Sequence, residues 1–529
     1  MAALSDVDTR PRPPQPKWAI LLVLCLAVLI VNLDNTILNV ALPTLVQRLK
    51  ASTDELQWIV DAYAMVFGGM MLVAGSLADR YGRKRLFVIG LVIFGAGSLG
   101  AAFAGGVDSL ISWRAVMGVG AAMTIPSGLS IVNDIFRDPA QRAKAVGVWA
   151  GTIGLGIAIG PVAGGLLLAR FWWGSIFLVN VPIAAVGIAG TLLLVPESRH
   201  QISRRPDPVG ATLAIAGLGL ILWAIIGGPN HGWISRGVLG SGLGGVAVIG
   251  GFVMWEHHID HPMLPLDFFR SRRFTIALFS VATAVFALLG GLFLQTQFFQ
   301  FSLGYTPLKA GMCILPIAGV LAAGALTSSS IVRVIGTKLT AGAGLLLVTG
   351  GLAQIAAESS IGMTYAQALP GMLLMGLGAG FLMPAATDSV LGAITRDDAG
   401  VGSATNSTAM QVGGALGVAV VGSVLSTKYQ DMLKGAIAGH HVPPVAKQAI
   451  LGSLGGALVV ARTVGGSLGA ALARAARMSF EQGSRDALIV AAVVTGVGVL
   501  LVLAALPSRP PVSLSRRSDN KVRPHRRSM

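Results

Sequence analysis

The chain has 529 residues, of which 53% are hydrophobic and only 12% are charged. Soluble domains carry about 25% charged residues, so this composition excludes an ordinary soluble protein and predicts an integral membrane protein in a lipid bilayer. The formal net charge of +16 comes from short basic clusters between apolar runs, which indicates membrane topology and no nucleic-acid partner.

Fourteen apolar segments follow one another along the chain. Each is near the length of about 20 residues that crosses the hydrocarbon core of a bilayer. No small-residue cleavage site follows the first segment, which is too long for the apolar part of a signal peptide, so it stays as helix 1. We predict transmembrane helices at 18–42, 57–78, 86–106, 110–133, 144–168, 175–195, 208–227, 237–256, 274–299, 308–332, 338–357, 366–391, 404–427 and 486–506.

The basic residues predict the orientation of these helices. With the N-terminus in the cytoplasm, 26 lysines and arginines fall in cytoplasmic connections and tails, against 5 in the short outer loops. Under the positive-inside rule both termini are therefore cytoplasmic. The predicted location is the bacterial plasma (inner) membrane, crossed many times.

The segment 428–485 is the only long outer loop in this scheme. Within it, 449–473 is apolar apart from Arg462 and is as long as a transmembrane span. A fifteenth span would place the basic C-terminal tail outside, against the charge rule. We therefore favour an outer hairpin or an interfacial helix over a fifteenth span.

A carboxylate, Asp34, interrupts the first apolar segment. A charge near the middle of a bilayer costs at least about 2.5–3.5 kcal/mol, so such a residue indicates a proton or substrate site. At 1.5 Å per residue, Asp34 lies about 24 Å from the cytoplasmic end of its helix. Arg114 and Asp61 enter their helices from outside and lie about 5–7 Å deep by the same rise. We expect the three side chains to share one level, where protonation of Asp34 would break an Asp34–Arg114 pair.

These side chains have structural alternatives. Asp61 is also compatible with an interfacial position, and Arg114 with a side chain that extends outward to the membrane surface. On a helical wheel, Asn32 and Thr36 lie on one face of helix 1 while Asp34 points nearly opposite. Only one of these faces can line a central cavity, and the sequence leaves open which one.

Several motifs along the chain carry a family resemblance. LDNTILNVALP (33–43), GSLADRYGRKR (75–85), RAVMGVGAAM (114–123) and GTIGLGIAIGPVAGG (151–165) stand in the order and on the helices of the major facilitator superfamily. The last of these resembles the antiporter motif of that superfamily. The chain is most similar to the fourteen-helix drug:proton antiporter branch, the EmrB/QacA type, through the further segments FLVNVP (177–182), PDPVGATL (206–213) and STAMQVGGALGVAVVGS (407–423).

The resemblance covers nearly the whole chain and implies an all-α membrane protein with the major facilitator fold. Two six-helix bundles and two inserted helices would give fourteen transmembrane helices. RVIGTK (333–338) weakly echoes RYGRK (80–84), as an internal repeat predicts. The expected parts are a cytoplasmic tail 1–17, an N-terminal bundle 18–195, a linker with the inserted helices 196–273, a C-terminal bundle 274–506 including the loop 428–485, and a basic tail 507–529.

Glycines and a proline mark the fifth helix. Gly156, Gly160 and Gly164 fall four residues apart and form one smooth face for a neighbouring helix. Pro161 removes a backbone donor and can bend the helix. Ordinary tight packing explains the same pattern, and such packing can itself control how two bundles rock or how protons leak.

The segment 75–85 holds a second candidate for conformational control. Gly75 allows a close approach, and Asp79 can pair with Arg83 or cap a helix. Asp134, at the cytoplasmic end of the fourth helix, is another partner for Arg83. The alternative is a solvated basic loop that only sets topology. By resemblance, these residues form a latch that holds the outward-open state closed on the cytoplasmic side.

The resemblance also bears on the substrate. Relatives that export organic cations carry acidic residues on the helix matching 404–427, where this chain has Ser407 and Gln411. Monovalent cationic or neutral lipophilic compounds are therefore expected, and not polyvalent cations. We expect Asp61, Asn35 and Gln411 to contact them, and Asp34 with Arg114 to couple transport to protons.

The predicted function is that of a proton-coupled multidrug exporter, which moves lipophilic drugs or metabolites out of the cell by alternating access. We expect a monomeric secondary transporter, not an enzyme, that uses the proton gradient and needs no cofactor or metal. The chain has no phosphate-binding loop for ATP. One alternative is an exporter of an endogenous metabolite or lipid on the same fold; the other is a passive channel or membrane sensor.

Overall fold

The computed structural model describes residues 16–198, 206–259, 262–360, 362–395, 398–439 and 441–507. The predicted tails 1–17 and 507–529 lie almost wholly outside these ranges. The same is true of several basic residues used for the orientation, namely Arg10, Arg12, Arg199, Arg204, Arg205, Arg396 and those of the C-terminal tail. Within the described ranges the chain forms helices and no strand.

The helices fall into three groups along the chain. The N-terminal group comprises α1 (Lys17–Leu49), α2 (Thr53–Tyr81), α3 (Arg83–Ala102), α4 (Val107–Ile135), α5 (Pro139–Arg170), α6 (Ser175–Leu178) and α7 (Asn180–Leu194). The inserted pair comprises α8 (Pro208–His231) and α9 (Arg236–His258). The C-terminal group comprises η1 (Leu266–Arg270), α10 (Arg272–Gln297), η2 (Phe298–Ser302), α11 (Pro307–Glu358), α12 (Tyr365–Leu391), α13 (Ala399–Ala436), α14 (Pro444–Gly452), α15 (Leu454–Val464) and α16 (Gly466–Ala505).

Thirteen helices of the described chain are long and apolar enough to cross a membrane. One of them, α11, has 52 residues and would be about 78 Å long if straight, more than twice the hydrocarbon thickness. Gly336 breaks it with a φ of 84°. Because α11 therefore makes two crossings, the fold has the fourteen that the sequence predicts. Gly82, at the matching place in the first half of the chain, also has a positive φ, of 111°.

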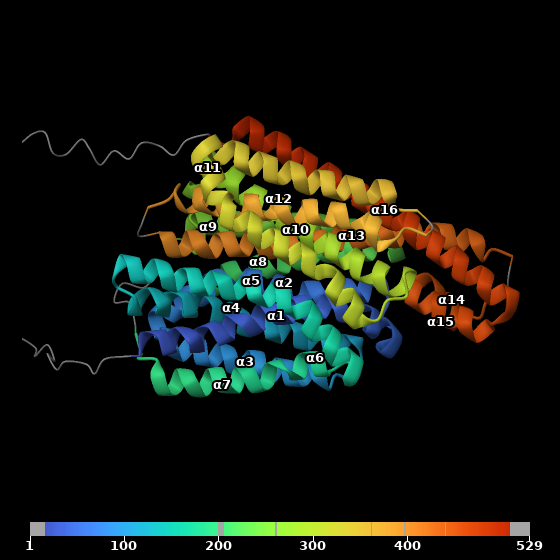
Figure 1. The fold of residues 1–529 in the computed structure, drawn as a ribbon, viewed down its shortest axis with the longest axis horizontal. Coiled ribbons are helices and arrows are strands. Elements are labelled where there is room, and N and C mark those ends of the chain that lie inside the picture. Colours follow the sequence, from blue (N-terminus) through green and yellow to red (C-terminus); the bar gives the residue numbers. More distant parts are fainter. Residues whose placement is uncertain are drawn as a thin grey trace, which may run out of the picture.

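The helices run roughly side by side, and the two ends of the molecule differ. In Figure 1, α1 begins and α16 ends at the left, whereas α14 and α15 project at the right. We call these the terminal face and the hairpin face. Since α1 runs from the terminal face to the hairpin face, α2 starts at the hairpin face and returns. Each later crossing likewise starts at the face where the previous crossing ended.

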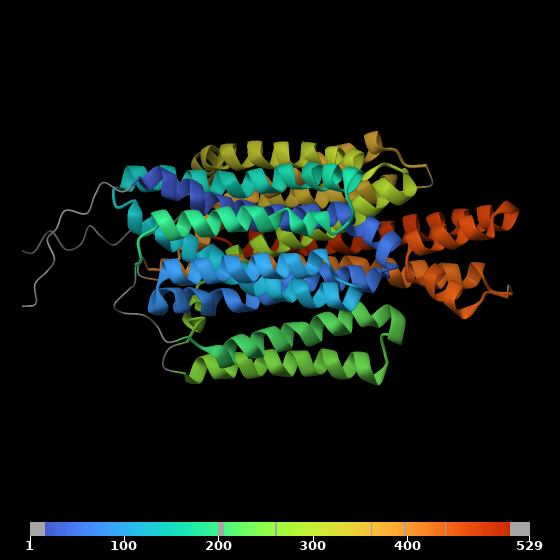
Figure 2. The same ribbon diagram turned by 90° about the horizontal axis from the view of Figure 1, so that it is seen from below.

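Two bundles account for most of the packing. In the N-terminal bundle, α1 contacts α5 and α7, and α4 contacts α2 and α3. In the C-terminal bundle, α10 contacts α12, α13 and α16, and α11 contacts α12 and α16. The inserted helix α8 packs against α2 and α13, one helix from each bundle, and α9 packs against α8. Figure 2 shows this inserted pair beside the two bundles.

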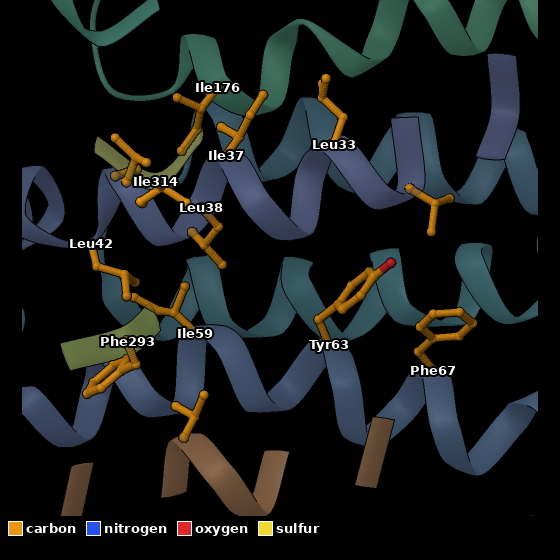
Figure 3. Close-up of a cluster of buried hydrophobic side chains, with 14 of the residues drawn as sticks. Leu33, Ile37, Leu38, Leu42, Ile59, Tyr63, Phe67, Ile176, Phe293 and Ile314 are labelled. Carbon is orange, nitrogen blue, oxygen red and sulfur yellow. The ribbon is translucent and has the colours of Figure 1, made fainter. Parts of the chain in front are cut away.

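The bundles contact each other over the half of the molecule near the hairpin face. Thr53 Oγ1 donates to the carbonyl oxygen of Gly452 at 3.0 Å, and Gln300 Nε2 donates to that of Val40 at 2.8 Å. Apolar side chains of α1 and α2, such as Leu42 and Ile59, share one buried cluster with Phe293 of α10 (Figure 3). The hairpin half of the space between the bundles is therefore filled.

The predicted outer loop 428–485 is mostly helical. Helix α13 continues to Ala436 and α16 begins at Gly466, so both extend beyond the predicted spans. Between them α14 and α15 have only 9 and 11 residues, interrupted at Ser453. Neither is long enough to cross a bilayer. The segment 449–473 therefore forms a helical hairpin and not a fifteenth span, as the charge rule favoured.

Candidate functional site

The expected pair of Asp34 and Arg114 lies inside the N-terminal bundle. Arg114 Nη1 of α4 donates to Asp34 Oδ2 of α1, and only 1% of Asp34 and none of Arg114 is exposed. Arg114 Nε also donates to the carbonyl oxygen of Ile59 on α2 at 3.1 Å. The complete burial of Arg114 rules out the alternative in which its side chain extends to the membrane surface. Ion pairing reduces the cost of burying both charges.

Two further residues complete this site, and the sequence did not single them out. Asn180 Nδ2, at the start of α7, donates to Asp34 Oδ1 at 3.0 Å and to Ser98 Oγ of α3 at 3.3 Å. The guanidinium carbon of Arg114 lies 4.3 Å from the centre of the Tyr63 ring, a cation–π contact. Asn180 belongs to the motif FLVNVP, and this motif is the sequence signal that could have identified it as a site residue.

The site is buried but not fully hydrogen-bonded. Arg114 Nη2 and Asn180 Oδ1 are both buried and find no hydrogen-bond partner in the described chain. The network therefore contains a donor and an acceptor that form no hydrogen bond in this conformation. Such groups favour rearrangement when the charge of the site changes, because an unpaired buried polar group costs about 1–3 kcal/mol.

The structure shows which face of helix 1 meets each neighbour. Asp34 faces α4 and α7 within the N-terminal bundle. Thr36 faces α5, where its hydroxyl donates to the carbonyl oxygen of Gly156 at 3.2 Å. Asn32 and Asn35 are half-buried, whereas Asp34 and Thr36 are buried. The Asp34 face thus belongs to the interior of one bundle, and Asn35 retains exposure.

Asp61 does not join Asp34 and Arg114, so the expected three-residue layer is not a contact network. Its side chain is 0% exposed, which also contradicts the alternative of an interfacial position. Both carboxylate oxygens lack a hydrogen-bond partner among the described residues. Gln57, one turn away on the same side of α2, donates to the carbonyl oxygen of Ala419 on α13 at 2.7 Å. Asp61 therefore faces the seam between α2 and α13.

Gln411 lies farther along the same seam. A Cβ atom on Gly68 of α2 would be 3.0 Å from Gln411 Cβ, and Thr408 Oγ1 donates to the Gly68 carbonyl oxygen at 3.1 Å. Gln411 is half-buried. Of the three expected substrate contacts, the structure thus places Asp61 and Gln411 along one seam between the bundles, and Asn35 on α1.

The glycines of α5 form the smooth face that their spacing predicts. Gly156, Gly160 and Gly164 all pack against α1, where an added Cβ would come within 3.0, 1.9 and 3.2 Å of side-chain atoms. The opposite side of α5 meets the other bundle. There the Pro161 carbonyl oxygen lies 2.2 Å from where a Cβ on Gly311 of α11 would stand. Pro161 lies inside α5, whose helix continues through it.

Arg83 binds both of its expected partners at once. Its Nε and Nη2 atoms donate to Asp79 Oδ1 at 2.9 and 2.7 Å, and Nη1 donates to Asp134 Oδ2. Most of the segment 75–85 is helical, since α2 ends at Tyr81 and α3 begins at Arg83. Gly82 alone connects the two helices, so the segment is not the solvated basic loop of the alternative interpretation. The close approach expected at Gly75 is absent, because no described atom lies within 4 Å of a Cβ there.

Comparisons with known proteins agree with this architecture. The Major Facilitator Superfamily model matches residues 24–418. The multidrug efflux pump LfrA of Mycolicibacterium smegmatis is 32% identical over 504 residues, which cover 95% of this chain and 97% of that protein. The methyl viologen resistance protein SmvA of Salmonella typhimurium is 34% identical over 478 residues, which cover 88% of this chain and 93% of that protein.

A solved structure has the same fold. The bacterial homolog of the human lysosomal transporter Spinster, in an inward-facing and occupied conformation, superposes with a TM-score of 0.66 at 17% identity. The match covers 94% of this chain and 97% of that one. The chain therefore belongs to the major facilitator superfamily and is a secondary transporter, not an enzyme.

Proposed function

We propose that this protein is a proton-coupled exporter of lipophilic cationic or neutral compounds. The buried Asp34–Arg114 pair is the observation that supports proton coupling most directly. When a carboxylate paired with a cation inside an apolar bundle gains a proton, the cation is left as an uncompensated buried charge, which is costly. Sequence similarity to multidrug and methyl viologen resistance proteins supports drug export.

The proposed cycle is alternating access by the two bundles. By the positive-inside rule, the terminal face lies in the cytoplasm and the hairpin face lies outside. Contact between the bundles over the hairpin half then corresponds to an inward-facing state. A compound would enter from the cytoplasm or inner leaflet and bind near Asp61, Asn35 and Gln411. The transporter would work as a monomer in the bacterial plasma membrane.

Proton transfer to Asp34 is the proposed coupling step. Once neutral, Asp34 no longer compensates the charge of Arg114, which keeps only the Ile59 carbonyl and the Tyr63 ring among the contacts described above. Removing one partner of a buried ion pair costs about 3–5 kcal/mol. This cost would favour a rearrangement of α1 against α4 and release of the compound. Return of the proton to the cytoplasm would restore the pair.

The substrate range is proposed from the charge of the seam. The chain has Ser407 and Gln411 on α13 where cation exporters of this branch carry acids, which leaves Asp61 as the carboxylate between α2 and α13. One carboxylate balances one positive charge. Monovalent cations and neutral compounds therefore fit this seam, whereas compounds with two or more charges do not.

The Asp34→Asn substitution tests the proposed function. We expect everted membrane vesicles with this variant to lose substrate-driven proton release and proton-driven uptake of a fluorescent lipophilic cation. Asp431→Asn is the matched control, because the side chain of Asp431 is 68% exposed, and it should transport normally. A panel of neutral, monovalent and polyvalent compounds in the same vesicles tests the substrate range. Normal coupled transport by Asp34→Asn would refute the proposal.

A further inference from the structure

The ends of the inserted helices α8 and α9 bring two buried carboxyl groups together at the terminal face. Asp207 stands directly before α8, and Glu256 belongs to the last turn of α9. Each residue is only 2% exposed. None of the ion pairs of the described residues involves either of them. Acidic residues are almost never fully buried unless they are paired, so their partners need an account.

Three N–H groups hold these carboxyl groups in place. The backbone N–H of Gly210 donates to Asp207 Oδ1 at 2.9 Å, and Trp255 Nε1 donates to Asp207 Oδ2 at 3.0 Å. The backbone N–H of Leu264 donates to Glu256 Oε2 at 3.0 Å. The fourth oxygen, Glu256 Oε1, is buried and has no donor in the described chain. An unpaired buried oxygen is costly, so this atom points to a proton or another ligand.

Glu256 Oε1 faces Asp207. A Cβ atom on Gly210 would lie 2.3 Å from Asp207 Oδ2 and 2.8 Å from Glu256 Oε1, so these two oxygens are no more than about 5 Å apart. The two side chains are placed for a hydrogen bond to each other. Ionised carboxylates only accept hydrogen bonds, so this bond requires a proton on one of them. Two buried like charges would also repel each other, which favours the same protonated state.

No other charge compensates this pair in the part of the chain that the structure describes. Asp207 is the only charged residue found to influence the Glu256 side chain. A metal ion is a poor fit, because metal ions need further oxygen ligands and the other neighbours of the pair are N–H donors. The charged residues of the surrounding elements are exposed or have other partners: His257, His258 and Arg80 are exposed, Asp267 pairs with Arg270, Asp79 pairs with Arg83, and Asp398 accepts a hydrogen bond from Thr395.

The pair lies beside the seam between α2 and α13. Leu264, whose N–H is bound by Glu256, packs against a buried apolar cluster that includes Met263 and Leu72 of α2. Val401 of α13 packs against the same cluster. The bond between Glu256 and Leu264 therefore connects the inserted helices to one helix of each bundle at the terminal face.

We propose that Asp207 and Glu256 form a proton-binding site, in which one proton lies between Glu256 Oε1 and Asp207 Oδ2. With the proton bound, the pair carries one negative charge, which the three N–H donors stabilise. When the proton leaves, two buried negative charges repel each other, and Leu264 loses its fixed place beside the seam. The pH at the terminal face thus controls how firmly the inserted helices are held there. This site is separate from Asp34 and Arg114 and does not rest on the proposed function.

Thermal unfolding of the purified full-length protein in detergent tests this site. A folded state that binds one more proton than the unfolded state becomes less stable as the pH rises. Wild-type Tm should therefore fall by about 2 °C or more relative to Glu256→Gln between about pH 5 and about pH 8. The glutamine amide donates to Asp207 as the protonated carboxyl group does, but it does not titrate. Asp267→Asn is the matched control, because 79% of the Asp267 side chain is exposed, and it should behave as wild type.

Infrared spectra provide a second measurement. At neutral pH, wild type and Asp34→Asn should both show the C=O stretching band of a protonated carboxyl group that Glu256→Gln lacks. Asp207→Asn should shift or remove this band, since the acceptor of the proton has changed. If Glu256→Gln does not fold, the comparison of Asp207→Asn with wild type decides. The proposal is overturned if Tm depends on pH equally in wild type and Glu256→Gln, or if Asp207→Asn leaves the band unchanged.

Discussion

At the scale of single residues, Asp34 is held by donors from two other helices. Arg114 of α4 occupies one carboxylate oxygen and Asn180 of α7 occupies the other. Both oxygens are thus satisfied only while Asp34 is charged and these helices keep their places. A proton on either oxygen displaces a donor, so the protonation state of one residue is linked to the packing of three helices.

This arrangement makes Asn180 a positioning residue for Asp34. We expect Asn180→Ala to slow proton-driven transport about tenfold or more, because a hydrogen bond to a charged group contributes about 1.5–3 kcal/mol. The apparent KM for the compound should stay near the wild-type value, since Asn180 does not face the seam between the bundles. Initial rates in everted vesicles measure both quantities.

Ser98→Ala is the control for Asn180→Ala. It removes the other acceptor of Asn180 Nδ2 and leaves the bond to Asp34 in place. We expect it to transport within about twofold of wild type, as is usual where only a neutral hydrogen bond of about 0.5–1.5 kcal/mol is lost. Equal losses in the two variants would show that Asn180 only supports the fold.

The charged residues of this site could be predicted from the sequence, and the neutral ones could not. Asp34 and Arg114 are conspicuous because charges within apolar segments are costly, and helix lengths give their depth. Asn180 and Tyr63 carry no such cost, and their contacts depend on how α2 and α7 turn about their axes. Asp61 shows the same limit, since depth alone grouped it with Asp34 although it faces α13.

At the scale of elements, α5 connects the two bundles. One side of it packs through glycines against α1, and the other side touches α11 at Pro161 and Gly165. Toward the terminal face, at Gly151 and Gly154, no described atom lies within 4 Å of an added Cβ. The close contacts of the α5 glycines therefore lie in the hairpin half, whereas Trp149 in the terminal half packs against Gly128 of α4.

A methyl group at Gly160 should disturb this contact. In Gly160→Ala the Cβ would lie 1.9 Å from Thr36 Oγ1 and 2.8 Å from Thr36 Cβ, so α1 and α5 must move apart. We expect a loss of about 1–3 kcal/mol in stability, measured as a lower Tm, together with slower transport. In Gly154→Ala, on the same helix, the methyl group has open space and Tm should not fall. A normal Tm for Gly160→Ala would refute tight α1–α5 packing.

The positions of the helices could be predicted from apolar length, but their connections could not. Hydropathy separates the two crossings of α11, yet the chain turns between them at Gly336 alone, which adopts a positive φ as Gly82 does. The weak echo of RYGRK in RVIGTK is thus matched by backbone geometry. Apolar length alone could not predict the helical hairpin of 428–485, because its short helices are separated by breaks at Ser453 and Gly465.

At the scale of the whole molecule, the contacts between the bundles extend from the hairpin face to about the middle of α2. Gln57 binds α13 near the hairpin face, and Gly68 meets Thr408 and Gln411 halfway along the helix. Alternating access requires this seam to open in the other half of the cycle. The inserted helix α8 packs along the same seam, so its contacts with one bundle must change as well.

A disulfide across the seam should therefore stop transport. In a variant with Cys25 and Cys313 replaced by alanine, Gly68→Cys and Gln411→Cys bring two thiols close together, since the Cβ atoms lie about 3.0 Å apart. Disulfides need about 3.5–4.5 Å, a small adjustment. We expect oxidation to abolish transport in everted vesicles and reduction to restore it, while each single-cysteine variant is unaffected by oxidant. Full activity of the cross-linked protein would mean that α2 and α13 do not separate, and that the bundles move about another contact.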